Sequence, residues 1–396
     1  MTHRERILAA MRGQKTDRLP WAPRMDLWCI ALRARNALPA RFAGMDTAGI
    51  ARTLDVGCHA VRADYTLARD PADLALRGLG VDNHPDYPYR VELRNLPMDF
   101  RHDAENLWTE IRTPAGPVHM HLQQSAEMTR AGISLPFVHD YAIHSAADFE
   151  AVAQVFEHLE VIPTPQNYAA FQRRVGNQGV AVANGSIGAS PMHLILHDLV
   201  AMDQFFYLYV DERAALEELG ERMKPFFLAQ LEAQAICSAE VAFWGGNYDQ
   251  NLTWPPFFAE QIAPWLQRVG QRLHASGKLL LTHTDGENGD LMPLYGACGF
   301  DVAESVCPHP MTKSSLAEIR EGMGAGIAVW GGLPSVAFLD DSMDMESFEA
   351  YGATLFGELG GGRRLVLGVA DNLPPDADMT RLARVQEWVE EFGPVG

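Results

Sequence analysis

The pattern of hydrophobic and polar positions alternates between short apolar runs and longer amphipathic stretches. Eight short runs are rich in β-branched or aromatic residues, and most precede a stretch long enough to hold a helix. They span residues 18–24, 57–64, 179–184, 241–246, 278–284, 301–306, 326–332 and 364–371. This succession is typical of βα units. It predicts an α/β fold, a (β/α)8 TIM barrel formed by residues 1–396 as one domain.

Two features lie outside the eight units. Thr2 and Glu5 form a capping-box pattern before apolar residues at helical spacing, which predicts a helix covering the bottom of the barrel. Between the second and third runs, at about residues 68–150, apolar and polar residues alternate around a turn at 113–116. Alternation with period two indicates strands. We therefore expect an inserted, β-rich antiparallel subdomain between strands 2 and 3.

Composition and charge narrow the range of partners. Hydrophobic residues make up 47% of the chain and charged residues 21%, as in globular proteins with a large core. A net charge of -19 repels nucleic acid and anionic membrane surfaces, which favours a small molecule or a protein as partner. The polar start and the absence of a long apolar run predict a cytoplasmic protein. Five cysteines without a CxxC pair argue against a disulfide framework or a zinc ribbon.

Polar and aromatic side chains stand at or near the ends of the predicted strands, where barrel enzymes bind their substrates. They are Arg24, Asp26, Asp64, Asn184, Trp244, Asn247, His283, Asp285, Glu304, Cys307, Trp330 and Asp371. Glu304 interrupts an apolar run, and an unpaired carboxylate near a core costs several kcal/mol, so it needs a cation, a metal or a raised pKa. We expect His283, Asp285 and Glu304 to be catalytic. The residues expected to bind substrate are Arg24, Asp26, Asn184, Trp244, Asn247, Trp330 and Asp371.

A metal is one way to compensate the buried carboxylate. His283, Glu304 and Cys307 offer a nitrogen, an oxygen and a sulfur, a set that zinc accepts with one position left open. Asp285 or Asp371 could replace Cys307, which can equally be a small apolar filler. Polar residues after strands also cap the following helices, so each position has a structural alternative.

Several short motifs, in order along the chain, carry a family resemblance. They are Arg4-Glu-Arg6, Met11-Arg-Gly13, Asp17-Arg-Leu-Pro20, His283-Thr-Asp-Gly286, Trp330-Gly-Gly332 and Gly368-Val-Ala-Asp371 with Pro374-Pro375. Together they resemble the uroporphyrinogen decarboxylase superfamily, which also holds cobalamin-related methyltransferases. The resemblance covers nearly the whole chain and implies a (β/α)8 barrel.

Within that superfamily, the chain resembles the methyltransferase branch more than the decarboxylases. Residues 24–28 and 184–188 depart from the decarboxylase patterns. The methyltransferase branch has a histidine at the fifth strand end and a glutamate at the sixth, as His283 and Glu304 are placed here. The cysteines that bind zinc in those relatives are missing from His283-x-Asp285 and from the end of the last strand. This departure favours an oxygen-linked methyl donor over a thiol acceptor.

The resemblance therefore implies a corrinoid-dependent methyltransferase acting as a demethylase. It would take a methyl group from a methoxylated, flat or aromatic small molecule and pass it to cobalamin held by a separate corrinoid protein. Either a metal such as zinc or a proton donor would stabilise the departing oxygen, with His283, Asp285 and Glu304 binding that metal or supplying the proton. Two alternatives remain open. One is a decarboxylase in which Arg24, Arg33 and Arg35 bind carboxylates, and the other is a non-catalytic binding protein on the same fold.

Overall fold

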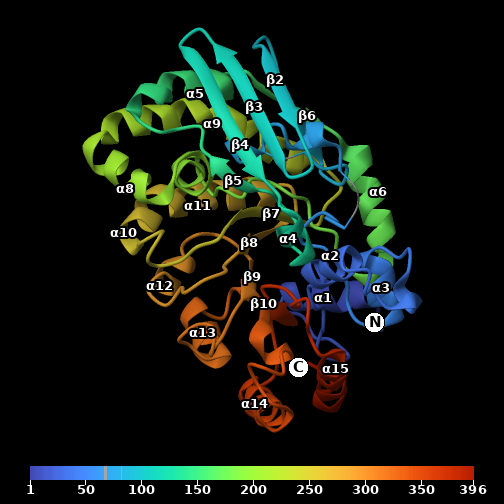
Figure 1. Cartoon of the computed structure of the whole chain (residues 1–396). Helices are drawn as coiled ribbons and strands as arrows, with labels where there is room; N and C mark the ends of the chain where they lie inside the picture. Colours follow the sequence, from blue (N-terminus) through green and yellow to red (C-terminus); the bar gives the residue numbers. More distant parts are fainter. Residues whose placement is uncertain (67–68, 82) are drawn as a thin grey trace.

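A computed structural model of the chain describes residues 1–66, 69–81 and 83–396 (Figure 1). Its strands are β1 Tyr89–Leu93, β2 Met98–His102, β3 Asn106–Thr113, β4 Gly116–Gln123, β5 Phe137–Asp140, β6 Leu159–Pro163, β7 Val241–Gly246, β8 Leu279–His283, β9 Val302–Val306, β10 Ala328–Pro334 and β11 Leu365–Ala370. Its α-helices are α1 His3–Met11, α2 Asp26–Ala34, α3 Thr47–Thr53, α4 Ala126–Arg130, α5 Phe149–Glu157, α6 Pro165–Val175, α7 Pro191–Leu194, α8 Met202–Asp211, α9 Arg213–Ile236, α10 Pro255–Phe257, α11 Ala263–His274, α12 Met292–Tyr295, α13 Leu316–Met323, α14 Met345–Glu358 and α15 Met379–Phe392. The chain thus belongs to the mixed α/β class.

A five-stranded parallel sheet, in the order β11-β10-β9-β8-β7, forms the centre of the second half of the chain. Nearly every residue of these strands is buried. Burial on both faces is expected when helices cover a parallel sheet, and it explains why the strands read as continuous apolar runs. The five strands coincide with the last five predicted runs.

The first three predicted runs do not form regular strands. They make isolated parallel bridges instead, Trp21 with Leu367 of β11, Cys58 with Gly179, and Ala183 with Ala242 of β7. A hydrogen bond of 2.8 Å from the Gly57 amide to the Trp21 carbonyl joins the first two segments. Proline explains part of the irregularity, because Pro20 and Pro23 in the first run cannot donate to a ladder.

Helix α1 packs against one end of this arrangement. Thr2 caps it and forms the expected capping box with Glu5. Its buried Ile7, Leu8 and Met11 share one apolar cluster with inward-facing side chains of the parallel strands; this inner cluster also holds Val61, Val182, Val241, Phe243, Leu281, Val302, Trp330 and Val366. The prediction of a helix at this place is confirmed.

The chain between the second and third runs contains a separate antiparallel sheet, in the order β2-β3-β4-β5. In Figure 1 it stands at one end of the molecule, beside α5 and α9. A second antiparallel pair joins β1 to β6. Antiparallel strands thus form where the alternation of apolar and polar residues predicted them. The limits of an inserted subdomain at about 68–150 stay a prediction.

The amphipathic stretches between the later apolar runs form helices that differ in regularity. The stretch 212–235 forms α9, and 315–322 forms α13. The stretch 194–210 is divided between α7, a π-helical turn at Ile195–Leu199 and α8, while 258–275 starts with a π-helical turn before α11. Within the described part of the chain, no helix combines the length and the hydropathy that crossing a membrane requires.

Candidate functional site

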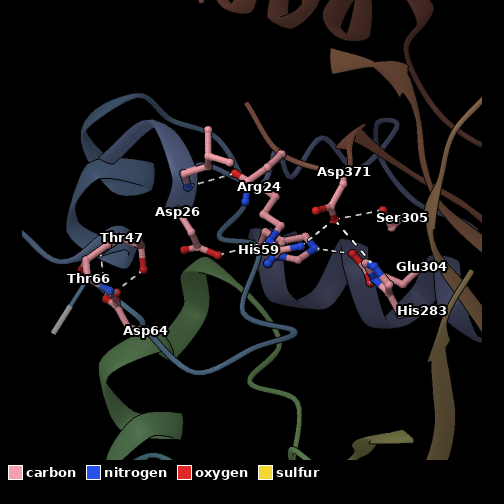
Figure 2. A network of polar contacts seen from close by, with 12 residues as sticks. Arg24, Asp26, Thr47, His59, Asp64, Thr66, His283, Glu304, Ser305 and Asp371 are labelled. Carbon is pink, nitrogen blue, oxygen red and sulfur yellow. Dashed lines mark hydrogen bonds and ion pairs between the residues drawn. The ribbon is translucent and has the colours of Figure 1, made fainter. Parts of the chain in front are cut away.

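Two histidines bind one buried carboxylate at the centre of the site (Figure 2). Nδ1 of His283 lies 2.6 Å from Oε2 of Glu304, and Nε2 of His59 lies 2.8 Å from Oε1 of the same side chain. All three side chains are at most 4% exposed. Both carboxylate oxygens of Glu304 are therefore engaged away from water.

Strand register brings the first two residues together. His283 of β8 and Glu304 of β9 are paired neighbours in the parallel ladder. Leu281 and Val302, two residues earlier in each strand, belong to the inner cluster. Because side chains repeat every two residues along a strand, His283 and Glu304 point to the same inner side.

His59 reaches the same carboxylate from the irregular second segment. Its neighbour Val61, two residues on, belongs to the inner cluster. The His59 ring packs edge-on against Trp330 of β10, with ring centroids 4.9 Å apart. The indole Nε1 of Trp330 in turn donates to the Ala22 carbonyl at 3.2 Å. Trp330 thus holds the imidazole of His59 in place.

The charges of this triad stabilise each other. Burial favours the neutral acid, but the positive charge of His283 and hydrogen bonds from both imidazoles outweigh it and hold the pKa of Glu304 well below its usual range. Burial likewise works against a charged His283, but the Glu304 carboxylate outweighs it and raises the pKa of that imidazole. His283 is therefore protonated more readily than an ordinary imidazole, with Glu304 as its counterion.

A second group of charges adjoins His283. Asp371, directly after β11, accepts hydrogen bonds from Nη1 of Arg24 at 2.6 Å and from Oγ of Ser305 at 3.1 Å. Its Oδ1 lies 3.8 Å from Nε2 of His283. Burial opposes its charge, but Arg24 and His283 outweigh that effect and hold the pKa of Asp371 below its usual range. Together with the triad, these residues form one network of His59, His283, Glu304, Arg24, Ser305 and Asp371. The Asp371 side chain is 39% exposed, so this network meets solvent on its side.

Two further carboxylates lie around this network. Burial raises the pKa of Asp26 although Arg24 donates to it from Nε at 3.3 Å. Burial also raises the pKa of Asp285, two residues after His283, against the charge of that histidine. Both groups are therefore better able than an exposed aspartate to carry a proton.

Asp64 is placed differently. Its Oδ2 accepts from the amide and hydroxyl of Thr47, and its Oδ1 accepts from the amide and hydroxyl of Thr66. Four donors on one carboxylate fix the loop that follows the second segment. Its role in the structure is to hold that loop and the start of α3.

The two tryptophans expected to bind substrate occupy packing positions. Trp244 is fully buried, donates to the Ala189 carbonyl and packs against Phe227 of α9, so it belongs to the layer between strands and helices. Trp330 is 1% exposed and supports His59. The expected aromatic surface at a binding mouth is thus not found at these two tryptophans, because both rings serve packing.

The two asparagines are also accounted for locally. The side-chain amide of Asn184 donates to the Gly185 carbonyl at 3.0 Å, while its buried Oδ1 has no partner among the described residues. Asn247 is exposed and contacts Nε2 of His197 at 2.9 Å. Its backbone amide donates to the carbonyl of His283. Asn247 therefore touches the network only through the main chain.

The predicted zinc ligands do not converge. The thiol of Cys307 lies near the carbonyls of Pro308 and Ala370, and burial raises its pKa to about 12. Both oxygens of Glu304 are already taken by imidazoles. Over residues 1–66, 69–81 and 83–396, no group of three or more His, Cys, Asp or Glu side chains is arranged to hold a metal ion. The set His283, Glu304 and Cys307 does not fit a zinc centre in this arrangement.

Two residues of the network were not expected from the sequence, His59 and Ser305. His59 lies within the second apolar run, like Glu304 in the sixth, and a polar residue that interrupts an apolar run was the available signal. Ser305 neighbours Glu304, and small hydroxyl residues near strand ends are too common to stand out.

A cavity of about 320 Å³ lies elsewhere, between α2, the antiparallel sheet and the segment after Asp64. Ile30, Tyr65, Leu107 and Leu122 are among its lining residues. None of the network residues lines it, so the cavity and the network are separate features.

Comparisons with protein-family models and with curated proteins gave no match. Among solved structures, the chain is similar to a methyltransferase from Methanosarcina mazei, with 15% sequence identity and a TM-score of 0.58. The similarity covers 99% of this chain and 99% of that one. At such low identity it shows that the two chains share a fold over their whole length.

Proposed function

We propose that the protein is a methyltransferase that removes a methyl group from the oxygen of a methoxylated small molecule. The observation that carries this proposal is the imidazole of His283, which is fixed by the buried Glu304 and has its Nε2 on the side of the partly exposed Asp371. The common fold with a methyltransferase and the family resemblance of the sequence support the same reaction class.

The proposal includes a closed (β/α)8 barrel. Five parallel strands and three bridged segments follow one another around a ring, and the bridge of Trp21 with Leu367 joins the first segment to the last strand. In such a barrel, reacting groups gather where strands end. His283 is the last residue of β8, and Asp371 directly follows β11.

His283 acts as the general acid. When the bond between the methyl carbon and the oxygen breaks, the oxygen keeps the electron pair and takes the proton from Nε2 of His283. Glu304 stays ionised and stabilises the charged imidazole before the transfer. His59 holds the other carboxylate oxygen, so the ring of His283 keeps one orientation. Proton donation of this kind contributes about 100- to 10,000-fold to a rate.

Arg24 and Asp371 border the place beside this acid where the departing oxygen would lie. Arg24 fixes Asp371 at 2.6 Å, and Asp371 lies 3.8 Å from the donating nitrogen of His283. A corrinoid bound to a separate protein would supply the nucleophile that accepts the methyl group. No step depends on a metal, because the predicted zinc ligands do not converge; zinc stays a prediction that elemental analysis tests.

The decarboxylase alternative gains no support from the arginines assigned to it. Arg33 donates to the carbonyls of Met45 and Thr66, and Arg35 donates to Arg130 and Asp376. Arg24 is occupied by Asp26 and Asp371. These arginines serve the structure rather than a substrate with many carboxylates.

The test is methyl transfer to free cob(I)alamin from a panel of methoxylated compounds, followed by absorbance of methylcobalamin and by detection of the demethylated product. We expect both products with wild type and neither with His283→Gln. The matched control is Arg268→Met, an exposed residue on α11. Equal product from wild type and His283→Gln would refute the proposed role of the site.

A further inference from the structure

Arg62 lies over the inner apolar cluster close to His283. It follows His59 by three residues, and its guanidinium carbon is 4.4 Å from the centroid of the Phe243 ring. Phe243 belongs to the inner cluster. The positive charge of Arg62 lowers the pKa of His283, which Glu304 and Asp371 raise. The guanidinium is therefore near enough to that imidazole for the two charges to interact. Arg62 therefore places a positive charge over the inner cluster, on the side of the proposed acid.

Within the described part of the chain, the side chain of Arg62 has no polar partner. It makes no hydrogen bond or ion pair with any residue described in the structure, and its Nε is shielded from solvent without an acceptor. The residue as a whole is half-buried, so part of the guanidinium is accessible. A shielded donor without an acceptor is costly in a folded protein, which suggests that a ligand completes it.

Neighbouring charges do have partners. Arg24, Arg33 and Arg35 donate to carboxylates or carbonyls. Glu304 is bound by two imidazoles, and Asp64 accepts four hydrogen bonds. Arg62 differs from each of them because the in-plane N–H donors of its guanidinium have no acceptor among the described residues.

We propose that Arg62 binds a carboxylate of the substrate, so that the methyl donor is a methoxylated organic acid. A guanidinium donates two parallel hydrogen bonds to a carboxylate, and stacking on Phe243 keeps its plane fixed. Asp26 and Asp64, which line one small cavity together with Arg62, disfavour a more highly charged anion such as a phosphate. The assignment of the ligand as methyl donor rests on the proposed function.

Binding to the full-length protein tests this without any methyl transfer. Calorimetric titration compares 4-methoxybenzoate with the uncharged 4-methoxybenzyl alcohol, on wild type, Arg62→Met, Arg62→Lys and Arg268→Met. Arg268 is a matched control, because its guanidinium carbon also lies over an aromatic ring, that of Trp265, at 5.6 Å. Thermal unfolding verifies that each variant is folded.

We expect wild type to bind the acid about 10-fold or more tightly than the alcohol. Arg62→Met should lose about 10- to 100-fold in affinity for the acid and leave that for the alcohol unchanged, Arg62→Lys should lose less, and Arg268→Met should equal wild type. If Arg62→Met does not fold, the affinities of wild type and Arg62→Lys for the acid are compared instead, and equal affinities would overturn the inference. The inference is overturned if wild type binds neither compound, if it binds both equally, or if Arg62→Met keeps the affinity for the acid.

The failure of this inference is distinguishable from that of the proposed function. Binding of the acid through Arg62 without methyl transfer would leave the carboxylate site standing and refute the methyltransferase. Methyl transfer from methoxylated acids whose KM is unchanged in Arg62→Met would support the methyltransferase and overturn the carboxylate site.

Discussion

The carboxylate of Glu304 lies 2.6 Å from Nδ1 of His283, and the two residues occupy paired positions on adjacent parallel strands. Each residue stabilises the charged form of the other, and this effect outweighs the cost of burial. Because Nδ1 is bound to Glu304, only Nε2 remains to face a reacting group. This one relationship sets the protonation state and the direction of the proposed acid.

Glu304→Gln should abolish most of the activity while keeping the fold. The amide matches the carboxylate in shape and still hydrogen-bonds both imidazoles, but it cannot hold the charge on His283. We expect kcat to fall by about 100-fold or more and the free energy of unfolding to change by about 1–2 kcal/mol. Steady-state kinetics and chemical denaturation measure both. Retained activity with a large loss of stability would show that Glu304 is structural.

Stability should depend on pH through the same pair. The contribution of Glu304, whose pKa is lowered, is fully present above 4.5 and is lost as pH falls through the folded value. The contribution of His283, whose pKa is raised, is fully present below 6.5 and is lost as pH rises through its folded value. The pair therefore stabilises the protein most between 4.5 and 6.5.

Denaturation of wild type and His283→Gln across pH 4.5 to 9 checks this window. The difference in unfolding free energy between the two should be largest up to pH 6.5 and should shrink above the raised pKa of His283. A difference that stays constant or grows with rising pH would contradict the pairing.

His59 should act as a positioning residue. His59→Phe leaves one oxygen of Glu304 without a donor, which costs about 1–3 kcal/mol of stability and raises the pKa of that carboxyl. The charge on His283 is then held less firmly, so the alkaline limb of the pH-rate profile should move to lower pH. His59→Gln can still donate a hydrogen bond to Glu304, so its alkaline limb should lie close to that of wild type. An unmoved profile in His59→Phe would mean that His59 only packs against Trp330.

Cys307→Ala should change neither metal content nor activity. Its thiol is buried among backbone carbonyls and its pKa is raised to about 12, so it stays protonated. Elemental analysis of chelator-washed wild type and Cys307→Ala, run beside the activity assay, measures this. Bound zinc that disappears in the variant would restore the metal set predicted from the sequence.

The last five strands could be predicted because strands buried on both faces read as apolar runs. Residues 18–24 and 57–64 show similar runs, yet they form only isolated bridges. Proline in the first run removes hydrogen-bond donors. The bridges also depend on contacts far along the chain, which a local pattern does not reveal. The antiparallel strands were legible because one face is polar, as in β3, where buried and partly exposed residues alternate.

The candidate site was partly predictable for a similar reason. His283 and Glu304 stood out as polar residues in apolar surroundings, and the ladder brings them together. Trp244 and Trp330 both lie in packed surroundings that the sequence alone does not reveal, Trp244 against Phe227 of α9 and Trp330 in the inner cluster. The partnership of His59 with Glu304 spans 245 residues of sequence, and such a long-range contact leaves no local pattern.

Protonation of the departing oxygen by His283 is tested most directly by varying the leaving group. Methyl transfer to cob(I)alamin is measured for wild type and His283→Gln with 4-nitroanisole and with 4-methoxybenzyl alcohol. The nitrophenolate leaves readily without a proton, so the variant should lose less than about 10-fold with that ether and at least about 100-fold with the other. Equal losses with both ethers, or no transfer by wild type from either, would contradict the claim.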